Sequence, residues 1–488
     1  MSKYQYEQLF IGGQWVDPLG NETIEIISPH TEEVIGHVRS ASPDDVDRAI
    51  ASANDAFYNS EWPHMPPDER RKFVERLLVC YRQRTEEIAQ IVTAEMGSPR
   101  WFSELAQGNA AAAMLETFIN SSKAFDWQAP NPTLDQLDDS QLKPYAMVRH
   151  EPVGVVGAIT PWNVPQLVIM PKLAPALLTG CSIVIKPAPE SPLDAMLLAE
   201  IIEEAELPKG VVSIIPGGRS AGERLVGHRG VDKVAFTGSS AVGKQIAQVC
   251  GARLARFSLE LGGKSAALIL DDSDLSQVVS GLQFASLMNS GQACVAQTRI
   301  LASRERYDEV VDAVSDMVAN LVVGDPSDLS TYIGPLVSKR QQLRVENYID
   351  IGIQEGANIV VGGLGMPKGL DRGWYVKPTV FANVENSMRV AREEIFGPVL
   401  SIIEYKDEDD AIRLANDSPY GLAGSIWSND RDHAVTIAKR IRSGMVGING
   451  FAPDLSSPFG GYKESGIGRE YGQFGLEGYC ELKSIYGV

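Results

Sequence analysis

Short β-rich runs alternate with longer amphipathic runs through the middle of this 488-residue chain, and this rhythm strongly limits its fold. The clearest amphipathic run begins at Ser191-Pro192, a helix cap followed by a first-turn proline, and keeps an apolar stripe to Glu206. Short strands joined by such helices predict a parallel, mostly buried sheet of the Rossmann-like α/β class. The β-rich runs occupy residues 153–159, 182–185, 211–215, 231–236 and 257–261.

The flanking segments predict further elements. Residues 23–27 alternate in polarity as a strand does, and Ser42-Pro43 followed by two aspartates is typical of a helix start. A second alternation begins with a β-rich run at 266–270 and continues as a helical run to Asn289. Prolines and aspartates interrupt the pattern between residues 129 and 145, so we expect a linker there.

Composition limits the classes of protein and partner. With 44% hydrophobic and 22% charged residues, the chain is typical of a soluble globular protein, and its length suits two or three domains. Its 44 basic and 63 acidic residues give a formal charge of -19, which argues against binding to nucleic acid or anionic membranes. Apolar runs stay below the roughly 18 residues of a membrane span, and no signal core follows the first residues, so we expect neither membrane insertion nor export.

The five cysteines are widely spaced, and none belongs to a Cys-x-x-Cys or Cys/His cluster. We therefore expect neither a disulfide framework nor a zinc site, and we expect no other metal. This cysteine usage fits a reducing cytoplasm. The five are Cys80, Cys181, Cys250, Cys294 and Cys480.

One cysteine and one glutamate stand in peptides suited to covalent catalysis on a carbonyl. Cys294 follows Gly-Gln-Ala at 291–293, where small neighbours let a substrate approach the sulfur, and Glu260 precedes a Gly-Gly pair at 262–263. A thiolate that adds to an aldehyde, followed by hydride loss, leaves a thioester that a carboxylate-activated water hydrolyses. None of the six histidines adjoins a recognised motif, so a Cys-His protease dyad has little support. Taken alone, a free cysteine such as Cys294 is usually a small buried hydrophobe, and a glutamate such as Glu260 is usually an ordinary salt-bridge acid.

Further peptides flank these two in a fixed order. Together they resemble the NAD(P)-dependent aldehyde dehydrogenase superfamily over nearly the whole chain. The flanking peptides are TPWNVP at 160–165, IKPA at 185–188, AFTGSSAVGK at 235–244, EEIFGP at 393–398, PFGGYK at 458–463 and GIGRE at 466–470.

The resemblance implies an aldehyde dehydrogenase-like α/β fold with a Rossmann-type cofactor domain, an α/β catalytic domain and a small β oligomerisation element. We expect the NAD(P)-binding domain at residues 1–135 and 154–261, the catalytic domain at 262–470, and the oligomerisation element at 136–153 and 471–488. A segment near 145–153 would pair with a C-terminal strand at 480–486. The expected assembly is a homodimer or homotetramer.

The resemblance also assigns roles to single residues. Cys294 is expected to be the nucleophile, and Glu260 the general base that activates water for deacylation. The side-chain amide of Asn163 and the backbone N–H of Cys294 would donate to the oxyanion. Glu470 resembles a second acid that helps relay protons in relatives, and a structural ion pair explains it equally well.

The cofactor is expected at the helix that opens after residue 237. Its Gly-x-x-x-x-Gly spacing departs from the usual Gly-x-Gly-x-x-Gly fingerprint, so the assignment depends on the resemblance. The resemblance implies that Ser239 contacts phosphate, Lys186 the adenosine ribose and Glu394 the nicotinamide ribose. The expected cofactor-binding residues are Thr160, Pro161, Trp162, Lys186, Gly217, Gly238, Ser239, Gly243, Glu394 and Phe396.

NAD is the expected cofactor, with NADP as the alternative. Many NAD-preferring relatives carry a glutamate three residues after the lysine that matches Lys186, whereas this chain has Pro189 there and Glu190 next. Arg219 could meet the 2′-phosphate of NADP, because guanidinium groups bind phosphate well.

The expected substrate is a small-molecule aldehyde that enters a mostly apolar pocket. The matching positions supply neither an aromatic cage for a quaternary ammonium group nor an arginine for a substrate carboxylate, so we expect an apolar aliphatic or aromatic aldehyde. The pocket residues implied by the resemblance are Val164, Val168, Ala293, Val295, Phe451 and Phe459.

The sequence thus predicts an oxidoreductase that converts an aldehyde to a carboxylate with NAD(P). A coenzyme A-acylating aldehyde dehydrogenase is the first alternative, although Glu260 favours water as the acyl acceptor. A non-catalytic dinucleotide-binding scaffold is the second alternative. The joint presence of Cys294, Glu260 and Asn163 argues against a scaffold.

Overall fold

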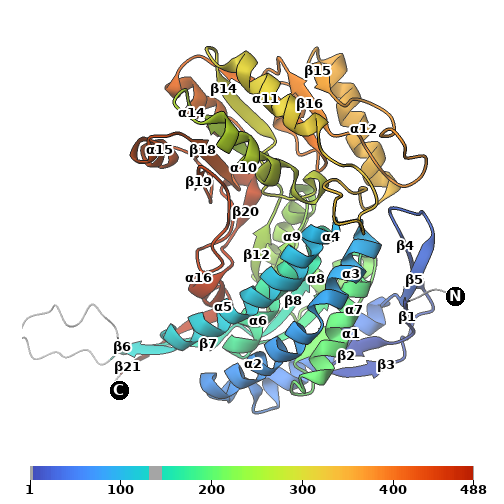
Figure 1. Cartoon of the computed structure of the whole chain (residues 1–488). Helices are drawn as coiled ribbons and strands as arrows, with labels where there is room; N and C mark the ends of the chain where they lie inside the picture. Colours follow the sequence, from blue (N-terminus) through green and yellow to red (C-terminus); the bar gives the residue numbers. More distant parts are fainter. Residues whose placement is uncertain (1–3, 131–145, 487–488) are drawn as a thin grey trace, which may run out of the picture.

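Two α/β lobes and a projecting arm make up the part of the chain that the structure, a computed structural model, describes, which is residues 4–130 and 146–486. Figure 1 shows the first lobe below, the second above, and the arm of β6, β7 and β21 extending to one side. The predicted linker at 129–145 lies almost wholly outside the described residues.

The first lobe is built on an eight-stranded sheet whose five central strands are parallel and whose outer strands run antiparallel. The five β-rich runs of the sequence form these central strands, so that prediction is confirmed. In spatial order the strands are β20 (Gly466–Ile467), β12 (Arg256–Glu260), β11 (Lys233–Thr237), β8 (Val155–Ile159), β9 (Ser182–Lys186), β10 (Val212–Ile214), β2 (Leu9–Ile11) and β3 (Gln14–Val16).

Alternate residues of the central strands pack into two cores, one on each face of the sheet. Val156 and Ile183 contact the core formed with α2, α3, α5, α6 and α7, whereas Val155 and Val184 contact the core formed with α1, α8 and α9. Burial on both faces explains why these strands are continuous apolar runs. The helices are α1 (Pro43–Tyr58), α2 (Pro67–Gln83), α3 (Thr85–Met96), α5 (Ala111–Ala124), α6 (Pro165–Thr179), α7 (Leu193–Glu204), α8 (Arg219–Gly227) and α9 (Ser240–Arg253).

The predicted helix start at Ser42-Pro43 is confirmed, whereas the predicted cap at Ser191 is wrong. Pro192 occupies the N-cap position of α7, and the Glu95 carboxylate accepts from the first backbone N–H groups of that helix. Ser42 caps α1 by accepting from the backbone N–H of Asp45, whose side chain accepts from the backbone N–H of Ser42 in return. Short elements complete the first lobe, namely η1 (Trp62–His64), α4 (Arg100–Phe102), the π-helix η2 (Ser103–Ala110) and the three-stranded sheet of β1 (Tyr4–Tyr6), β5 (Val34–Arg39) and β4 (Thr23–Ile27).

The strand order changes direction between β8 and β11. From β8 the chain builds β9 and β10 on one side of the sheet, and then returns to add β11 and β12 on the other side. Open α/β sheets bind ligands at the carboxyl ends of strands next to such a switch point. The peptide at 160–164 follows β8 and the peptide at 238–239 follows β11, so both lie at this edge.

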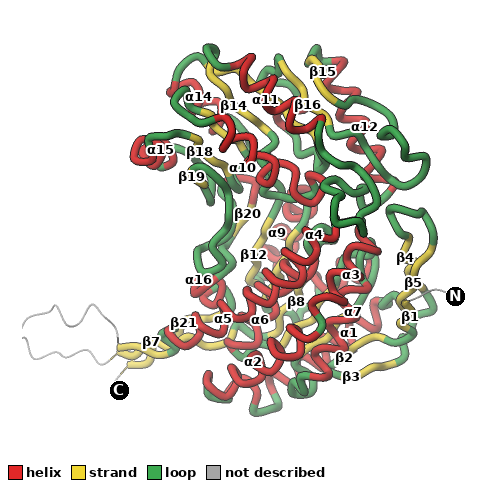
Figure 2. Tube along the Cα trace, viewed as in Figure 1, coloured by secondary structure: helices red, strands yellow, loops and turns green. Residues whose placement is uncertain are grey.

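The second lobe has a seven-stranded sheet, covered by helices in Figures 1 and 2. In spatial order its strands are β15 (Asn358–Val361), β16 (Thr379–Ala382), β17 (Val399–Tyr405), β14 (Arg299–Ser303), β13 (Ala266–Ile269), β18 (Gly424–Trp427) and β19 (Gly447–Ile448). Its helices are α10 (Leu275–Leu287), η4 (Met288–Gly291), α11 (Tyr307–Ala319), α12 (Lys339–Gln354), α13 (Arg389–Arg392), α14 (Glu408–Asn416), α15 (Arg431–Ala438) and η5 (Lys463–Ser465).

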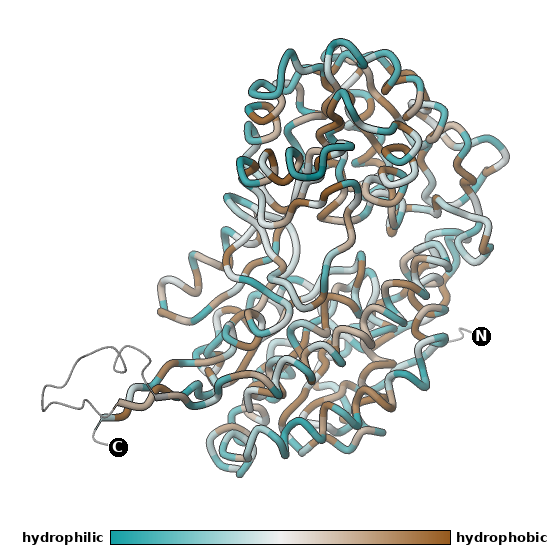
Figure 3. Tube along the Cα trace, turned by 60° about the vertical axis from the view of Figure 1, so that its left-hand side comes forward, coloured by the Kyte–Doolittle hydropathy of each residue, from teal (hydrophilic) through white to brown (hydrophobic). Residues whose placement is uncertain are grey.

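The arm pairs the C-terminal strand of the chain with two strands that precede β8 in sequence. β7 (Ala146–Pro152) is the central strand of the arm, with β21 (Cys480–Tyr486) and β6 (Gln128–Pro130) antiparallel to it on either side. Helix α16 (Gly472–Glu477) immediately precedes β21. Figure 3 shows the arm from a second direction, again standing clear of both lobes. The predicted pairing of residues near 145–153 with 480–486 is confirmed, and its role in oligomerisation stays a prediction. In residues 4–130 and 146–486, the helices are too short or too polar to cross a membrane.

Candidate active site

The Cys294 peptide follows a tight left-handed turn at the end of α10. Asn289, Ser290 and Gly291 have φ values of 52°, 59° and 72°. A Cβ atom at Gly291 would overlap the backbone carbonyl of Gly397, so only glycine fits there. The turn therefore brings residues 291–294, which we call the thiol loop, against the EEIFGP peptide of the second lobe.

Asn163 is tied to this thiol loop by two hydrogen bonds. Its Nδ2 donates to the carbonyl oxygen of Gln292 at 2.9 Å, and Asn289 Nδ2 donates to the carbonyl oxygen of Asn163 at 2.8 Å. All three side chains are buried. One N–H of the Asn163 amide anchors the side chain, which leaves the second N–H for a ligand.

Glu260 ends β12 as a buried carboxyl group without hydrogen-bond partners. The residue is 3% exposed, and neither Oε1 nor Oε2 is bonded to another protein group. Burial, and then the nearby Glu470 carboxyl, raises the pKa of Glu260 well above its usual value. A Cβ at Gly460 would lie 2.8 Å from Oε1, so this glycine leaves room for the Glu260 carboxyl group.

Burial raises the pKa of the Cys294 thiol to about 12, and the carboxyl groups of Glu394 and Glu260 contribute to the rise. The sulfur is therefore protonated at neutral pH in the ligand-free protein. A base or a nearby positive charge is needed before it can attack a carbonyl carbon.

The predicted cofactor residues gather at the switch point of the first sheet. Ser239 caps α9 by accepting from the Val242 N–H, and Lys186 Nζ donates to the carbonyl oxygens of Pro187 and Gly217, each at 2.8 Å. The buried Thr160 hydroxyl has no partner. A spare Lys186 proton, this hydroxyl and the helix N-terminus are donors of the kind that ribose hydroxyls and a pyrophosphate require, so the residues fit a dinucleotide.

Glu394, the acid predicted to bind the nicotinamide ribose, contacts the Gly-Gly pair that follows β12. Glu394 Oε1 accepts from the Gly263 N–H at 3.0 Å, and burial raises the pKa of Glu394 to about 7. The Trp162 and Phe396 rings meet edge to face with centroids 5.4 Å apart. These contacts join the TPWNVP and EEIFGP peptides with the LELGGK peptide at 259–264, which contains Glu260, around one site.

Apolar side chains surround the thiol loop. A cavity of about 280 Å³ is lined by Met445, Phe451, Phe459 and Tyr471, among others. Val164, Ala293 and Val295 belong with Phe451, Phe459 and Cys294 to one hydrophobic cluster. The predicted Val168 is not among this cluster. Members that the sequence did not indicate include Phe102, Ala106, Leu167, Met288 and Met445.

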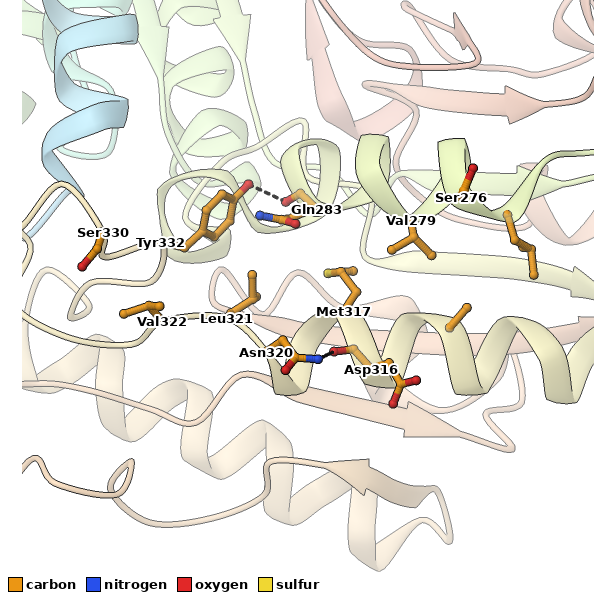
Figure 4. Close-up of a pocket in the computed structure, with 12 residues that line it drawn as sticks. Ser276, Val279, Gln283, Asp316, Met317, Asn320, Leu321, Val322, Ser330 and Tyr332 are labelled. Carbon is orange, nitrogen blue, oxygen red and sulfur yellow. Dashed lines mark hydrogen bonds between the residues drawn. The ribbon is translucent and has the colours of Figure 1, made fainter.

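A second cavity, of about 620 Å³, lies elsewhere. Figure 4 shows Val279 of α10 facing Met317 of α11, with Tyr332 closing one end through a 2.8 Å hydrogen bond to the Gln283 carbonyl oxygen. None of the predicted site residues lines it. Within residues 4–130 and 146–486, no cluster of three or more His, Cys, Asp or Glu side chains is arranged to hold a metal ion.

Comparison with known proteins decides the family. The sequence model described as the aldehyde dehydrogenase family matches residues 15–485. The chain belongs to the aldehyde dehydrogenase family. This membership confirms the predicted fold class and the predicted enzyme class.

Three aldehyde dehydrogenases illustrate the similarity. The geranial dehydrogenase of Castellaniella defragrans is 44% identical, over 99% of this chain and 98% of its own length. The structure of a Mycobacterium tuberculosis aldehyde dehydrogenase complexed with NAD+ has a TM-score of 0.96 at 46% identity, covering 100% of this chain and 99% of that one. A Pseudomonas syringae aldehyde dehydrogenase C mutant with NAD+ and octanal has a TM-score of 0.94 at 38% identity, covering 98% and 96%.

Several residues of this aldehyde dehydrogenase site were not indicated by the sequence. Asn289 and Gln292 hold Asn163, and Lys172 donates from Nζ to Glu470 Oε1 at 2.7 Å. These contacts join residues from different elements, so no local pattern marks them. A buried lysine in an otherwise apolar helix is the one signal that could have indicated Lys172.

Proposed function

We propose that this chain oxidises apolar aldehydes to carboxylates with NAD as the hydride acceptor and water as the acyl acceptor. The observation that carries the proposal is the joining of the Cys294 loop to Asn163 by the Asn163–Gln292 and Asn289–Asn163 hydrogen bonds, amid apolar side chains. A thiol and an amide donor held together in this way suit attack on an uncharged carbonyl.

In the acylation half-reaction, the Cys294 thiol gives its proton to the Glu260 carboxylate, which lies close enough to raise the thiol pKa, and the sulfur bonds to the aldehyde carbon. The free N–H of the Asn163 amide and the backbone N–H of Cys294 donate to the oxyanion that forms. Bound oxidised nicotinamide supplies a hydride acceptor. When the aldehyde C–H electron pair leaves, the carbon–oxygen double bond reforms and Cys294 carries a thioester.

In the deacylation half-reaction, Glu260 takes a proton from water while the water oxygen attacks the thioester carbon. The carbon–sulfur bond then breaks, which releases the carboxylate and returns the Cys294 thiolate. Burial without hydrogen-bond partners supports this role, because it raises the basicity of the Glu260 carboxylate. After burial, the Glu470 carboxyl is the next contributor to the raised pKa of Glu260, so it lies nearby, and Lys172 holds it. We therefore propose Glu470 as the group that receives that proton from Glu260.

NAD is favoured over NADP by the surroundings of Lys186 and Arg219. Burial lowers the pKa of Lys186 to about 8, and Glu190 lies close enough to oppose part of that shift. Glu190 also pairs with Arg340 at 2.7 Å, so an acid stands near the expected adenosine ribose. Arg219 is occupied by Glu223, also at 2.7 Å. A 2′-phosphate would meet this acidic charge, and the M. tuberculosis and P. syringae structures contain NAD+.

The substrate class follows from the apolar lining of the site. Phe451 and Phe459 line the 280 Å³ cavity, whose wall is mostly apolar apart from Asp454 and Ser457. Both phenylalanines also belong to the hydrophobic cluster that contains Cys294. The C. defragrans relative is named for geranial, and the P. syringae structure contains octanal. Both compounds are apolar aldehydes. We expect medium-length aliphatic aldehydes to be oxidised more efficiently than aldehydes that carry a charge.

The projecting arm supports a homodimer or homotetramer. β21 and β7 expose side chains such as Leu482 and Tyr486, which are 68% and 79% exposed, on a sheet that stands away from both lobes. Apolar groups on such a sheet favour burial against a second copy. A cytoplasmic location agrees with five free thiols.

Steady-state absorbance at the reduced-nicotinamide band tests the proposal. Octanal, benzaldehyde and a carboxylate-bearing semialdehyde would be compared with NAD and with NADP, using wild type and Cys294→Ala. We expect the highest kcat/KM for octanal with NAD, no turnover in C294A, and no dependence on coenzyme A. Turnover that requires coenzyme A and is unchanged in Glu260→Gln would overturn the assignment of Glu260.

A further inference from the structure

Helix α6 begins at a place where its own sequence supplies no cap. Val164 occupies the N-cap position without a side-chain hydrogen bond, and Pro165 at the first helical position has no N–H. The first free backbone N–H groups are therefore those of Gln166 and Leu167, only a few residues after Asn163. Buried N–H groups of this kind need an acceptor from elsewhere in the fold.

A single oxygen atom of a distant side chain meets this need. Gln107 Oε1 accepts from the Gln166 N–H at 3.1 Å and from the Leu167 N–H at 3.4 Å. Gln107 is fully buried, and its backbone carbonyl oxygen accepts from the Tyr81 hydroxyl at 2.5 Å. The cap of α6 is therefore supplied by another element, which is itself held in place.

Gln107 belongs to the π-helix η2 (Ser103–Ala110), where the wider turn changes the direction in which side chains leave the helix. Such turns are uncommon and occur frequently at functional sites. Ala106, the preceding residue, belongs to the same hydrophobic cluster as Cys294 and Phe451. The π-helix thus contributes to the lining of the site and to the cap of α6 through adjacent residues.

We infer that Gln107 is a positioning residue for Asn163, whose amide it holds in place by fixing the first turn of α6. The inference rests on the proposed oxyanion role of Asn163. Gln166 and Leu167, whose N–H groups are capped, follow Asn163 by three and four residues. A tilt of this turn therefore moves the Asn163 amide relative to the thiol loop. Small displacements of an oxyanion donor lower the rate of the chemical step strongly.

A second contact keeps α6 folded when the Gln107 oxygen is removed. Gln166 Nε2 donates to the backbone carbonyl oxygen of Asp194 at 2.9 Å and to its Oδ2 at 2.5 Å. The start of α6 therefore stays attached to α7 through its side chain while its backbone N–H groups lose their acceptor. Loss of Gln107 should affect the geometry of Asn163 more than the fold of the lobe.

The chain offers matched substitutions for the test. Gln107→Met keeps the length of the side chain and removes the acceptor, whereas Gln107→Glu keeps an oxygen in the same place. Gln107 Nε2 has no hydrogen-bond partner, so Q107E loses no contact that the wild type makes. The measured quantity is the single-turnover rate of reduced-nicotinamide formation with octanal and NAD, since this rate reports acylation without deacylation.

We expect Q107M to lower this rate about tenfold, Q107E to remain within about twofold of wild type, and NAD affinity to be unchanged in both. In an Asn163→Ala background, which alone should lose about 10²–10³-fold, Q107M should have less than a twofold effect. Equal effects of Q107M in both backgrounds, or a wild-type rate for Q107M, would overturn the inference.

Two further outcomes are distinguishable. If N163A alone keeps the wild-type rate, the proposed oxyanion role fails, whatever Q107M does. If Q107M does not fold, Gln107→Asn replaces it, because the shorter side chain withdraws the oxygen by one methylene group. A rate for Q107N that equals wild type would contradict the inference in the same way.

Discussion

Lys172 Nζ lies 2.7 Å from Glu470 Oε1 in the interior of the first lobe, where the Lys172 side chain is fully buried and that of Glu470 is 7% exposed. Lys172 also donates to the Thr237 hydroxyl at 2.8 Å, which connects α6 to the end of β11. The pair therefore joins the helix that follows Asn163 to the C-terminal segment and the central sheet.

Removing one member of this pair should destabilise the protein strongly. Lys172→Met leaves the Glu470 carboxylate buried without its cation, a change that costs about 3–5 kcal/mol in comparable pairs. We expect a clear fall in Tm, measured by thermal unfolding at neutral pH, and a partial recovery in the double variant Lys172→Met/Glu470→Gln.

The exposed pair Lys72–Glu69 is a matched control, because its ions are also 2.7 Å apart and both are more than half exposed. Lys72→Met should change stability by less than about 1 kcal/mol. Equal shifts in Tm for K172M and K72M would contradict the importance of burial.

Gly291→Ala should abolish activity while Gly356→Ala does not. Both glycines have positive φ, 72° and 92°, so each alanine bears a similar backbone cost of about 1–2 kcal/mol. Only at Gly291 does the added Cβ overlap a backbone carbonyl, since no atom lies within 4 Å at Gly356. Turnover of octanal by the two variants, with far-ultraviolet circular dichroism as the folding check, measures the difference; an active G291A variant would show that the thiol loop tolerates displacement.

Alkylation of Cys294 by iodoacetamide should keep accelerating up to pH 10 in the ligand-free protein. Only the thiolate reacts, and the pKa of this thiol is raised to about 12. Glu394→Gln removes a neighbouring negative charge above pH 7 and should therefore raise the rate there. Mass spectrometry of the Cys294 peptide excludes the other cysteines, and a rate that levels off below pH 9 would disagree with a thiol pKa raised to about 12.

NAD affinity should weaken as pH rises through about 8. Burial lowers the pKa of Lys186 to about 8, so its ammonium group loses its proton in this range and with it a charged donor for the ribose. Fluorescence titration of NAD between pH 6.5 and 9.5 would measure the effect. The Lys186→Met variant should bind NAD weakly at every pH. If NAD affinity in this variant still falls as pH rises through 8, the pH dependence belongs to another group.

Much of the fold could be predicted because its signals are local. Strands that are buried on both faces are short apolar runs, and the capping box at Ser42 marks the start of α1. Helix α6 is a counterexample, since Pro171 and Pro175 lie inside it. Its nearly complete burial between the sheet and α5 stabilises a helix that local propensity disfavours.

The chemical groups of the candidate site could also be predicted, whereas the contacts that hold them could not. Cys294, Glu260 and Asn163 stand in recognisable peptides, but Gln107 lies far from them in sequence and its π-helix has no pattern of its own. The hydrogen bond from Gln107 to α6 depends on how two helices pack, which a single sequence does not specify.

Trapping the acylated enzyme tests the central claim most directly. Glu260→Gln would be mixed with octanal and NAD, and the reduced nicotinamide formed would be counted against the mass of the intact protein. The account predicts one equivalent of reduced nicotinamide per site and an octanoyl group on Cys294, because hydride transfer needs the thiol and hydrolysis needs Glu260. Repeated turnover at the wild-type rate, or reduced nicotinamide without an acyl group on Cys294, would contradict it.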